Sequence, residues 1–169
     1  MPRQPAPNAP AIPFLCSMVA PVADKNELKD FGRYLQRASK NEVLRRLPQL
    51  HAEAFAAIDC LQCAACCKNY SPRFKTPDVK RISRALGMKE GAFIEKYLQV
   101  DDEGDFVVRS KPCPFLGADN TCSIYAVRPS DCARFPYTDE DVVVKRQPLT
   151  LKNASFCPIV YRVLQGLTH

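Results

Sequence analysis

The sequence predicts a small α+β domain in which helices dominate, strands are short, and irregular loops carry a set of cysteines. Three observations support this fold class. Apolar residues recur at helical spacing in several stretches, strand-like runs are only three or four residues long, and prolines and glycines crowd residues 110–137. A chain of 169 residues is long enough for one domain with a modest hydrophobic core. We therefore expect a single domain over residues 24–169.

The first 23 residues differ in composition from the rest of the chain. Residues 1–23 contain six of the fifteen prolines and Arg3 as their one charged side chain. Because proline fixes φ and lacks a backbone N–H, we expect a disordered, proline-rich segment here. Pro13 interrupts the apolar stretch 11–20, so no secretory signal is expected, and Cys16 lacks the small preceding residue of a lipoprotein. No apolar run approaches the roughly 18 residues that cross a bilayer, and we expect a soluble, cytoplasmic protein without membrane contact.

Two helices are predicted before the first cysteines of the main set. Leu28 and Leu35 recur at helical spacing with charged residues between them, which predicts a helix over about residues 25–39. The same period continues over about residues 43–58, where Pro48 favours a break or kink.

The basic segment after these cysteines predicts two more helices. Thr76 is suited to cap a helix whose first turn holds Pro77, and Gly87 is suited to end it. A shorter helix over about residues 90–98 would bury its apolar side chains, Phe93 among them.

The rest of the chain predicts short elements between irregular loops. The acidic residues 101–105 predict a turn, and residues 106–108 predict a short strand after it. Residues 142–145 and 149–151 predict two further short strands. Apolar residues at helical spacing over 159–167 predict a terminal helix.

Eight of the nine cysteines form one organised set. Four of them lie within eight residues, in the spacing C-x2-C-x2-C-C. Thiolate sulfur is the preferred soft ligand of zinc and of iron–sulfur clusters, and eight thiolates suffice for two four-coordinate sites. The sequence therefore predicts metal-binding loops. The predicted metal ligands are Cys60, Cys63, Cys66, Cys67, Cys113, Cys122, Cys132 and Cys157.

The spacing of the first four cysteines bears on how they share a metal. On an ideal helix they would span an arc of about 120° and face one side. Adjacent side chains diverge, however, so Cys66 and Cys67 suit two metals or one larger cluster better than a single zinc ion. The later cysteines must supply the remaining ligands. Prolines on both sides of Cys113 and after Cys157 stiffen the backbone at those positions.

Disulfides and buried structural thiols are the competing explanations of the cysteines. An odd total, a weak export signal and the adjacent pair Cys66 and Cys67 are atypical of a secreted disulfide framework. One or two cysteines would fit a hydrophobic core, but eight of them, half within eight residues, do not. We therefore favour metal over both alternatives.

The positive charge of the chain is concentrated in one segment. The formal net charge is +6, and residues 68–89 contain seven basic residues against one acidic residue, Asp78. Eight thiolates holding two divalent ions would leave about −4 at the sites, so we expect the basic residues to compensate thiolate charge. A surface for nucleic acid or an acidic partner is the less favoured alternative, because few aromatic residues accompany the basic ones.

Catalytic motifs are scarce in this chain. The histidines are His51, in a predicted helix, and His169 at the terminus, and neither stands beside a cysteine in sequence. A glycine-rich phosphate loop and an H-E-x-x-H motif are both missing. We assign no catalytic and no cofactor-binding residue, and the residues leave open whether the protein is an enzyme.

The residues that flank the cysteines carry a family resemblance. The order C-x2-C-x2-C-C, C-P-F-L, C-S-I-Y, R-P-x-x-C-x-x-F-P and C-P closely resembles the YkgJ-type CxxCxxCC family of zinc- or iron-chelating domains. The resemblance covers about residues 55–167, with Ala65 at a frequent glycine and Ala133 at a frequent arginine. The matching segments are Cys60–Cys67, Cys113–Leu116, Cys122–Tyr125, Arg128–Cys132, Phe135–Pro136 and Cys157–Pro158.

The resemblance implies metal binding, with zinc and an iron–sulfur cluster equally favoured. A complete thiolate set without a substrate-binding motif favours a non-catalytic accessory or chaperone-like module that serves a protein partner. The alternative is an iron–sulfur redox protein or a component of a protein-modifying enzyme, because related cysteine motifs occur in a flagellin lysine methylase.

Overall fold

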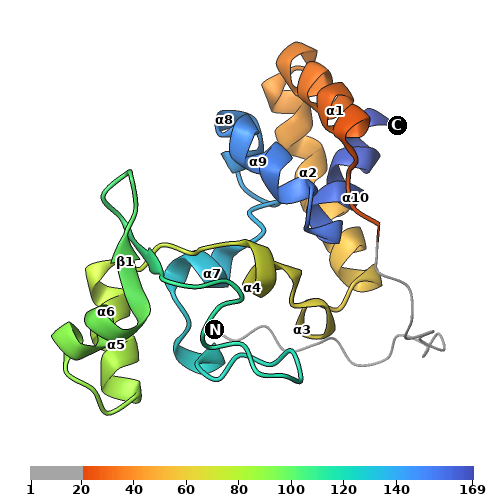
Figure 1. The fold of residues 1–169 in the computed structure, drawn as a ribbon. Helices are drawn as coiled ribbons and strands as arrows, with labels where there is room; N and C mark the ends of the chain where they lie inside the picture. Colours follow the sequence, from red (N-terminus) through yellow and green to blue (C-terminus); the bar gives the residue numbers. More distant parts are fainter. Residues whose placement is uncertain (1–20) are drawn as a thin grey trace.

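The computed structural model describes residues 21–169, whose helices form two groups joined by the cysteine-bearing segments (Figure 1). Most of the predicted disordered segment, together with Cys16, lies outside the described residues. The elements are α1 (Lys25–Arg37), α2 (Lys40–Ala57), α3 (Cys60–Cys63), α4 (Ala65–Asn69), α5 (Thr76–Ala85), α6 (Glu90–Tyr97), β1 (Leu98–Val100), β2 (Phe106–Val108), the 3-10 helix η1 (Tyr125–Val127), α7 (Ser130–Arg134), α8 (Val142–Lys145), α9 (Gln147–Ala154) and α10 (Pro158–Thr168).

The fold is helix-dominated α+β, which confirms the predicted class. The helices predicted around residues 25–39, 43–58, 90–98 and 159–167 are present as α1, α2, α6 and α10. In the described part of the chain, β1 and β2 form one two-stranded antiparallel sheet, with Leu98 opposite Val108. None of the helices described for residues 21–169 has both the length and the hydrophobicity to cross a membrane.

The first hydrophobic core is formed by α1, α2, α8, α9 and α10. Leu47 and Leu164 are among its fully buried side chains. The helices α2 and α10 approach closely at Gly166, where an added Cβ would lie 2.5 Å from a methyl carbon of Leu50. The Arg46 guanidinium donates to a carbonyl oxygen near the end of α10 at 2.9 Å, which satisfies a group that has no partner within the helix.

The second hydrophobic core is formed by α5, α6, the hairpin and the loop that follows it. Phe93 is fully buried and stacks on Phe115 with the ring centroids 6.2 Å apart. Ile82 of α5 and Leu98 of β1 are also fully buried in this core. Phe115 lies two residues after Cys113, so the packing of this core fixes the position of a cysteine-bearing loop.

The two strands predicted near residues 142–151 are helices, and this prediction was wrong. Residues 142–145 form α8, and residues 149–151 lie in α9, which holds Pro148 in its first turn. Proline is tolerated there because a first-turn N–H has no partner within the helix. Val143 and Val144 are buried in the first core, so tertiary packing overrides their preference for strands.

Two helix details also differ from expectation. Pro48 lies inside α2, which is continuous over 18 residues rather than broken at the proline. Thr76 is the first residue of α5 rather than its cap. The carboxylate of Asp78 instead accepts a hydrogen bond from the backbone N–H of Lys75 at 3.1 Å. An acidic side chain therefore satisfies a backbone donor at the start of this helix.

Candidate metal centre

Most of the predicted ligands lie in the segments between the two cores, and Cys157 lies at the start of α10 (Figure 1). All eight are free thiols, so in residues 21–169 no disulfide joins any of them. Cys157 is buried within the first core, whereas Cys113 and Cys122 pack against the second. The cysteine set therefore spans the boundary between the cores.

The first four cysteines lie on two short helices rather than on one. The break is at Ala64, whose φ of +48° is a left-handed conformation that side chains other than glycine seldom adopt. Before it, the Cys63 N–H donates to the Asp59 carbonyl at 3.1 Å, in a single helical turn. The ideal-helix arc expected for these residues does not apply, because the chain turns between Cys63 and Cys66.

The adjacent thiols Cys66 and Cys67 lie side by side on α4. Their Sγ atoms are 3.9 Å apart, close enough for a sulfur–sulfur hydrogen bond. The backbone carbonyl of Cys67 accepts a hydrogen bond from the N–H of Cys113 at 2.8 Å. Two cysteine groups separated by 46 positions in sequence therefore meet directly.

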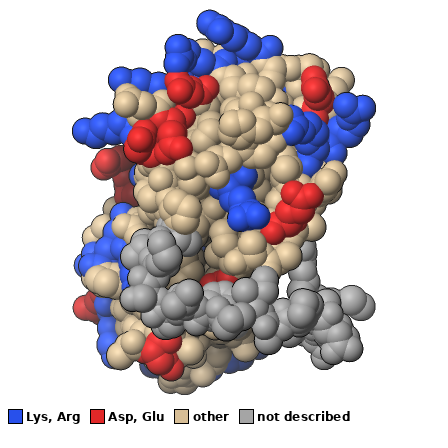
Figure 2. All heavy atoms as spheres, turned by 90° about the vertical axis from the view of Figure 1, so that its right-hand side faces the viewer, with Lys and Arg blue, Asp and Glu red and all other residues tan. Residues whose placement is uncertain are grey.

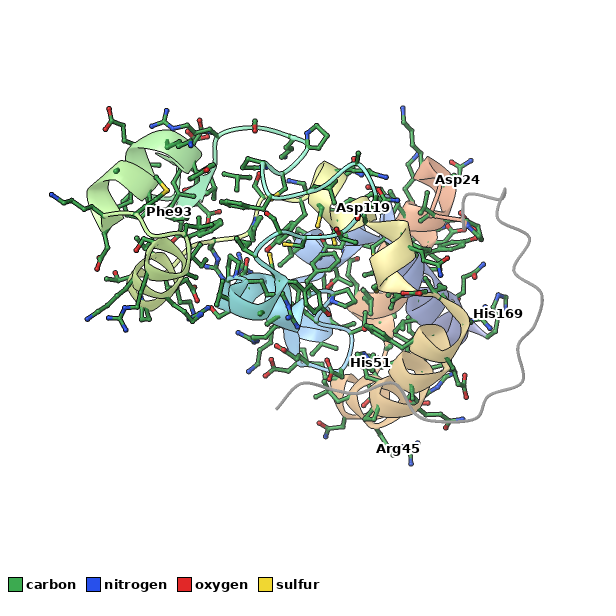
Figure 3. The ribbon with its side chains drawn as sticks, turned by 90° about the horizontal axis from the view of Figure 1, so that it is seen from below. Asp24, Arg45, His51, Phe93, Asp119 and His169 are labelled. Carbon is green, nitrogen blue, oxygen red and sulfur yellow. The ribbon has the colours of Figure 1, made fainter. Side chains whose placement is uncertain are left out.

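The loop from Cys113 to Cys122 closes on itself and then contacts α3. Leu116 and Cys122 form an antiparallel bridge, so both ends of the loop stand together. At its tip, Asn120 has a φ of +63°, and its side-chain amide donates to the Gln62 carbonyl at 3.0 Å. In Figure 3, neighbouring Asp119 is labelled between Phe93 on one side of the molecule and Asp24 and His169 on the other.

A polar network fixes the segment that holds Cys132. Asp131, which is 5% exposed, accepts hydrogen bonds from the Tyr70 hydroxyl at 2.6 Å and from the Arg73 backbone N–H at 3.0 Å. The Tyr137 hydroxyl donates to the Asp131 carbonyl at 3.2 Å. These contacts join α7 to the chain just after Cys67.

Sequence reasoning missed the part played by Tyr70 and Asp131. The sequence feature that could have pointed to them is their position, because Tyr70 lies three residues after Cys67 and Asp131 immediately precedes Cys132. A single sequence does not reveal that the two side chains meet across 61 positions.

Burial and mutual repulsion raise the pKa of most of these thiols. Burial raises the pKa of Cys157 to about 11, and the nearby Cys63 charge adds to this effect. Burial likewise raises the pKa of Cys132, and the charges of Cys113, Cys67 and then Cys122 raise it further. A metal cation bound among the cysteines would lower these pKa values, because each thiolate would then face a positive charge.

Cys67 is the exception among the thiols. Its pKa falls to about 7, chiefly because the Cys66 thiol donates a hydrogen bond to its sulfur, and Lys68 adds a smaller electrostatic contribution. Burial opposes this shift. The pKa of Cys66 is raised in turn, since its proton is held in that bond. The pair therefore presents one thiolate near neutral pH.

The donor chemistry fits a soft metal, but the thiols as placed do not yet converge on one point. Among residues 21–169, no group of three or more His, Cys, Asp or Glu side chains lies close enough to hold a metal ion. Zinc–sulfur bonds are only about 2.3 Å long, so metal binding requires the side chains to rotate inward. Such coupling of metal binding to local structure is common in small metal-binding domains.

Within residues 21–169, neither histidine belongs to a group of three or more side chains that could hold a metal ion. The Nδ1 atom of His51 lies 2.9 Å from the Thr138 hydroxyl and 3.8 Å from an Asp139 carboxylate oxygen. His169 stands at the end of α10.

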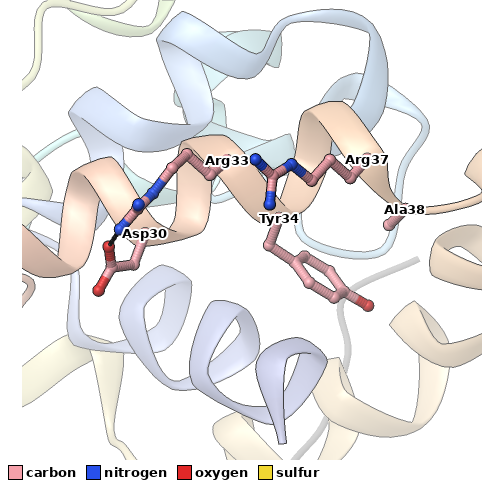
Figure 4. A pocket seen from close by; sticks show the side chains of 5 residues that line it. All are labelled: Asp30, Arg33, Tyr34, Arg37 and Ala38. Carbon is pink, nitrogen blue, oxygen red and sulfur yellow. Dashed lines mark hydrogen bonds and ion pairs between the residues drawn. The ribbon is translucent and has the colours of Figure 1, made fainter.

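Two hollows lie in the described surface, one along α1 and one next to the segment that holds Cys132. One of about 440 Å³ runs along α1 and is lined by Asp30, Arg33, Tyr34, Arg37 and Ala38, with Arg33 paired to Asp30 (Figure 4). Another of about 200 Å³ lies beside the network around Asp131. Neither of these two hollows is lined by a cysteine, so neither offers a substrate site at the thiols.

The basic segment 68–89 is partly neutralised by local ion pairs. Arg81 donates to the Asp78 carboxylate at 2.8 Å, and Arg73 lies 3.5 Å from Asp105. On the face drawn in Figure 2, basic and acidic side chains are interspersed rather than gathered by sign.

Comparison with known proteins gives one match. A family model named CxxCxxCC, described as a "putative zinc- or iron-chelating domain", matches residues 59–158. This range contains all eight of the predicted ligands. Comparisons with curated proteins and with solved structures gave no match.

Proposed function

This chain belongs to the CxxCxxCC family, and on that premise we propose that its eight clustered cysteines hold zinc or an iron–sulfur cluster. The protein acts as a non-catalytic accessory or chaperone-like module for a protein partner. It works in the cytoplasm, where thiols stay reduced and available for metal.

One observation carries this proposal: the two cysteine groups meet although their sequence positions are far apart. The N–H of Cys113 donates to the carbonyl of Cys67 at 2.8 Å, and all eight thiols are free. Sulfur is the ligand type that zinc and iron–sulfur clusters prefer. A core that needed only small apolar residues would not gather eight thiols around the boundary between two cores.

The accessory role is inferred from the full coordination of a metal ion by cysteines alone. A zinc ion with four thiolates has no open position for water or substrate, so it stabilises structure and does not catalyse. The alternative is a redox or protein-modifying role, which requires a cluster with an accessible second oxidation state.

Metal analysis after anaerobic purification tests the proposal. We expect stoichiometric zinc, or iron with acid-labile sulfide and visible absorbance near about 400 nm. The Cys16→Ser variant is the matched control, because it removes the one cysteine outside the set. Protein without bound metal, also after incubation with Zn²⁺ or with iron and sulfide under reducing conditions, would refute metal binding.

Redox titration of the metal-loaded protein separates the two roles. A metal-loaded protein that shows no redox couple supports the accessory role. A reversible one-electron couple at a physiological potential would replace it with the redox alternative.

A further inference from the structure

We propose that the eight cysteines form two separate four-thiolate centres, one attached to each hydrophobic core. This inference rests on the proposed function and specifies its site. The first centre consists of Cys60, Cys63, Cys66 and Cys157. The second centre consists of Cys67, Cys113, Cys122 and Cys132.

The second centre is supported by a continuous set of contacts. Cys67 and Cys113 are joined by their backbone hydrogen bond of 2.8 Å. The bridge between Leu116 and Cys122 returns the loop to its start, so Cys122 stands near Cys113. Both Cys113 and Cys122 pack against the second core.

Cys132 joins the second centre through the residue before it. Asp131 accepts hydrogen bonds from Tyr70 at 2.6 Å and from the Arg73 N–H at 3.0 Å, and both donors closely follow Cys67 in the chain. The network therefore holds Cys132 beside the segment that carries Cys67.

The first centre is supported by the helix turn of α3 and by the first core. Cys60 and Cys63 are one helical turn apart, so their side chains project from the same face. Cys157 is buried in the first core, and Ile58, two residues before Cys60, packs against that core. The residues just before α3 and the residue just before α10 are therefore both anchored to the first core.

The boundary between the centres falls between Cys66 and Cys67. The Cα–Cβ bonds of neighbouring residues on a helix point about 100° apart, so rotation of the side chains can turn the two thiols toward different centres. Their present separation of 3.9 Å is also close to the roughly 3.8 Å between two sulfurs on one zinc ion. The assignment of this pair is therefore the sharpest point on which to test the division.

Cadmium is a suitable probe because it is a soft, four-coordinate substitute for zinc and is visible by NMR. We expect the full chain to bind two ¹¹³Cd²⁺ ions and to give two resonances. Scalar coupling to cysteine Hβ protons then identifies the ligands of each ion without any substitution. Couplings of Cys66 to one ion and Cys67 to the other support the division.

Paired variants give a second, independent readout. Cys157→Ser should remove one metal and one resonance, and Cys122→Ser should remove the other. Cys16→Ser should leave both resonances in place.

The outcomes separate this inference from the proposed function. A single bound ion, or one resonance coupled to both Cys66 and Cys67, overturns the division but leaves metal binding intact. Absence of cadmium binding in the unaltered chain overturns both.

Discussion

Replacement of Asp131 is the sharpest test of how the fold holds the proposed metal segments. In Asp131→Ala, the Tyr70 hydroxyl and the Arg73 backbone N–H lose a charged acceptor inside the protein. Each hydrogen bond to a charged group contributes about 1.5–3 kcal/mol, so the free energy of unfolding should fall by about 3–6 kcal/mol. The ion pair with the Arg73 guanidinium adds little, because that side chain is 40% exposed and 3.8 Å away.

Urea unfolding followed by circular dichroism measures this loss. Asp131→Asn keeps an oxygen acceptor, so its loss should be smaller than that of Asp131→Ala. Asp102→Asn is the matched control, since this exposed residue should shift stability by less than about 0.5 kcal/mol. A loss below about 1 kcal/mol in Asp131→Ala would show that the network does not hold α7, and the placement of Cys132 would lose its support.

Three other perturbations test separate parts of the fold. Gly166→Ala should destabilise the protein by about 1–3 kcal/mol in thermal unfolding, because the new Cβ meets Leu50, whereas Gly91→Ala has open space and should not. Burial raises the pKa of Asp78, but hydrogen bonds from three neighbours outweigh it and hold that pKa below its usual value. The contribution of Asp78 to stability is therefore complete above about pH 5 and is lost as the pH falls through the folded pKa. On acidification from about pH 5 to 2.5, Asp78→Asn should therefore lose less stability than the unaltered protein. In the metal-free protein, iodoacetamide should label Cys67 first, with a rate that rises through about pH 7, and peptide mapping that finds uniform labelling would contradict this.

The local elements were largely predictable because their signals are local. Leu28 and Leu35 mark the buried face of α1, and the periodicity of residues 159–167 marks α10. Each helix shows its apolar face in its own sequence. The prediction was wrong for residues 142–151 because Val143 and Val144 favour strands by their local preference. Their burial in the first core makes them helical instead.

The sequence by itself determined the chemistry of the candidate site. Eight cysteines in this spacing indicate soft-metal ligation, because thiolate sulfur is a preferred ligand of such metals in any fold. Only the tertiary structure showed which of the segments that carry those cysteines lie together. The contact between Cys67 and Cys113 and the bond between Tyr70 and Asp131 join residues far apart in the chain. Such contacts depend on how the two cores pack, and a local spacing pattern contains no information about that packing.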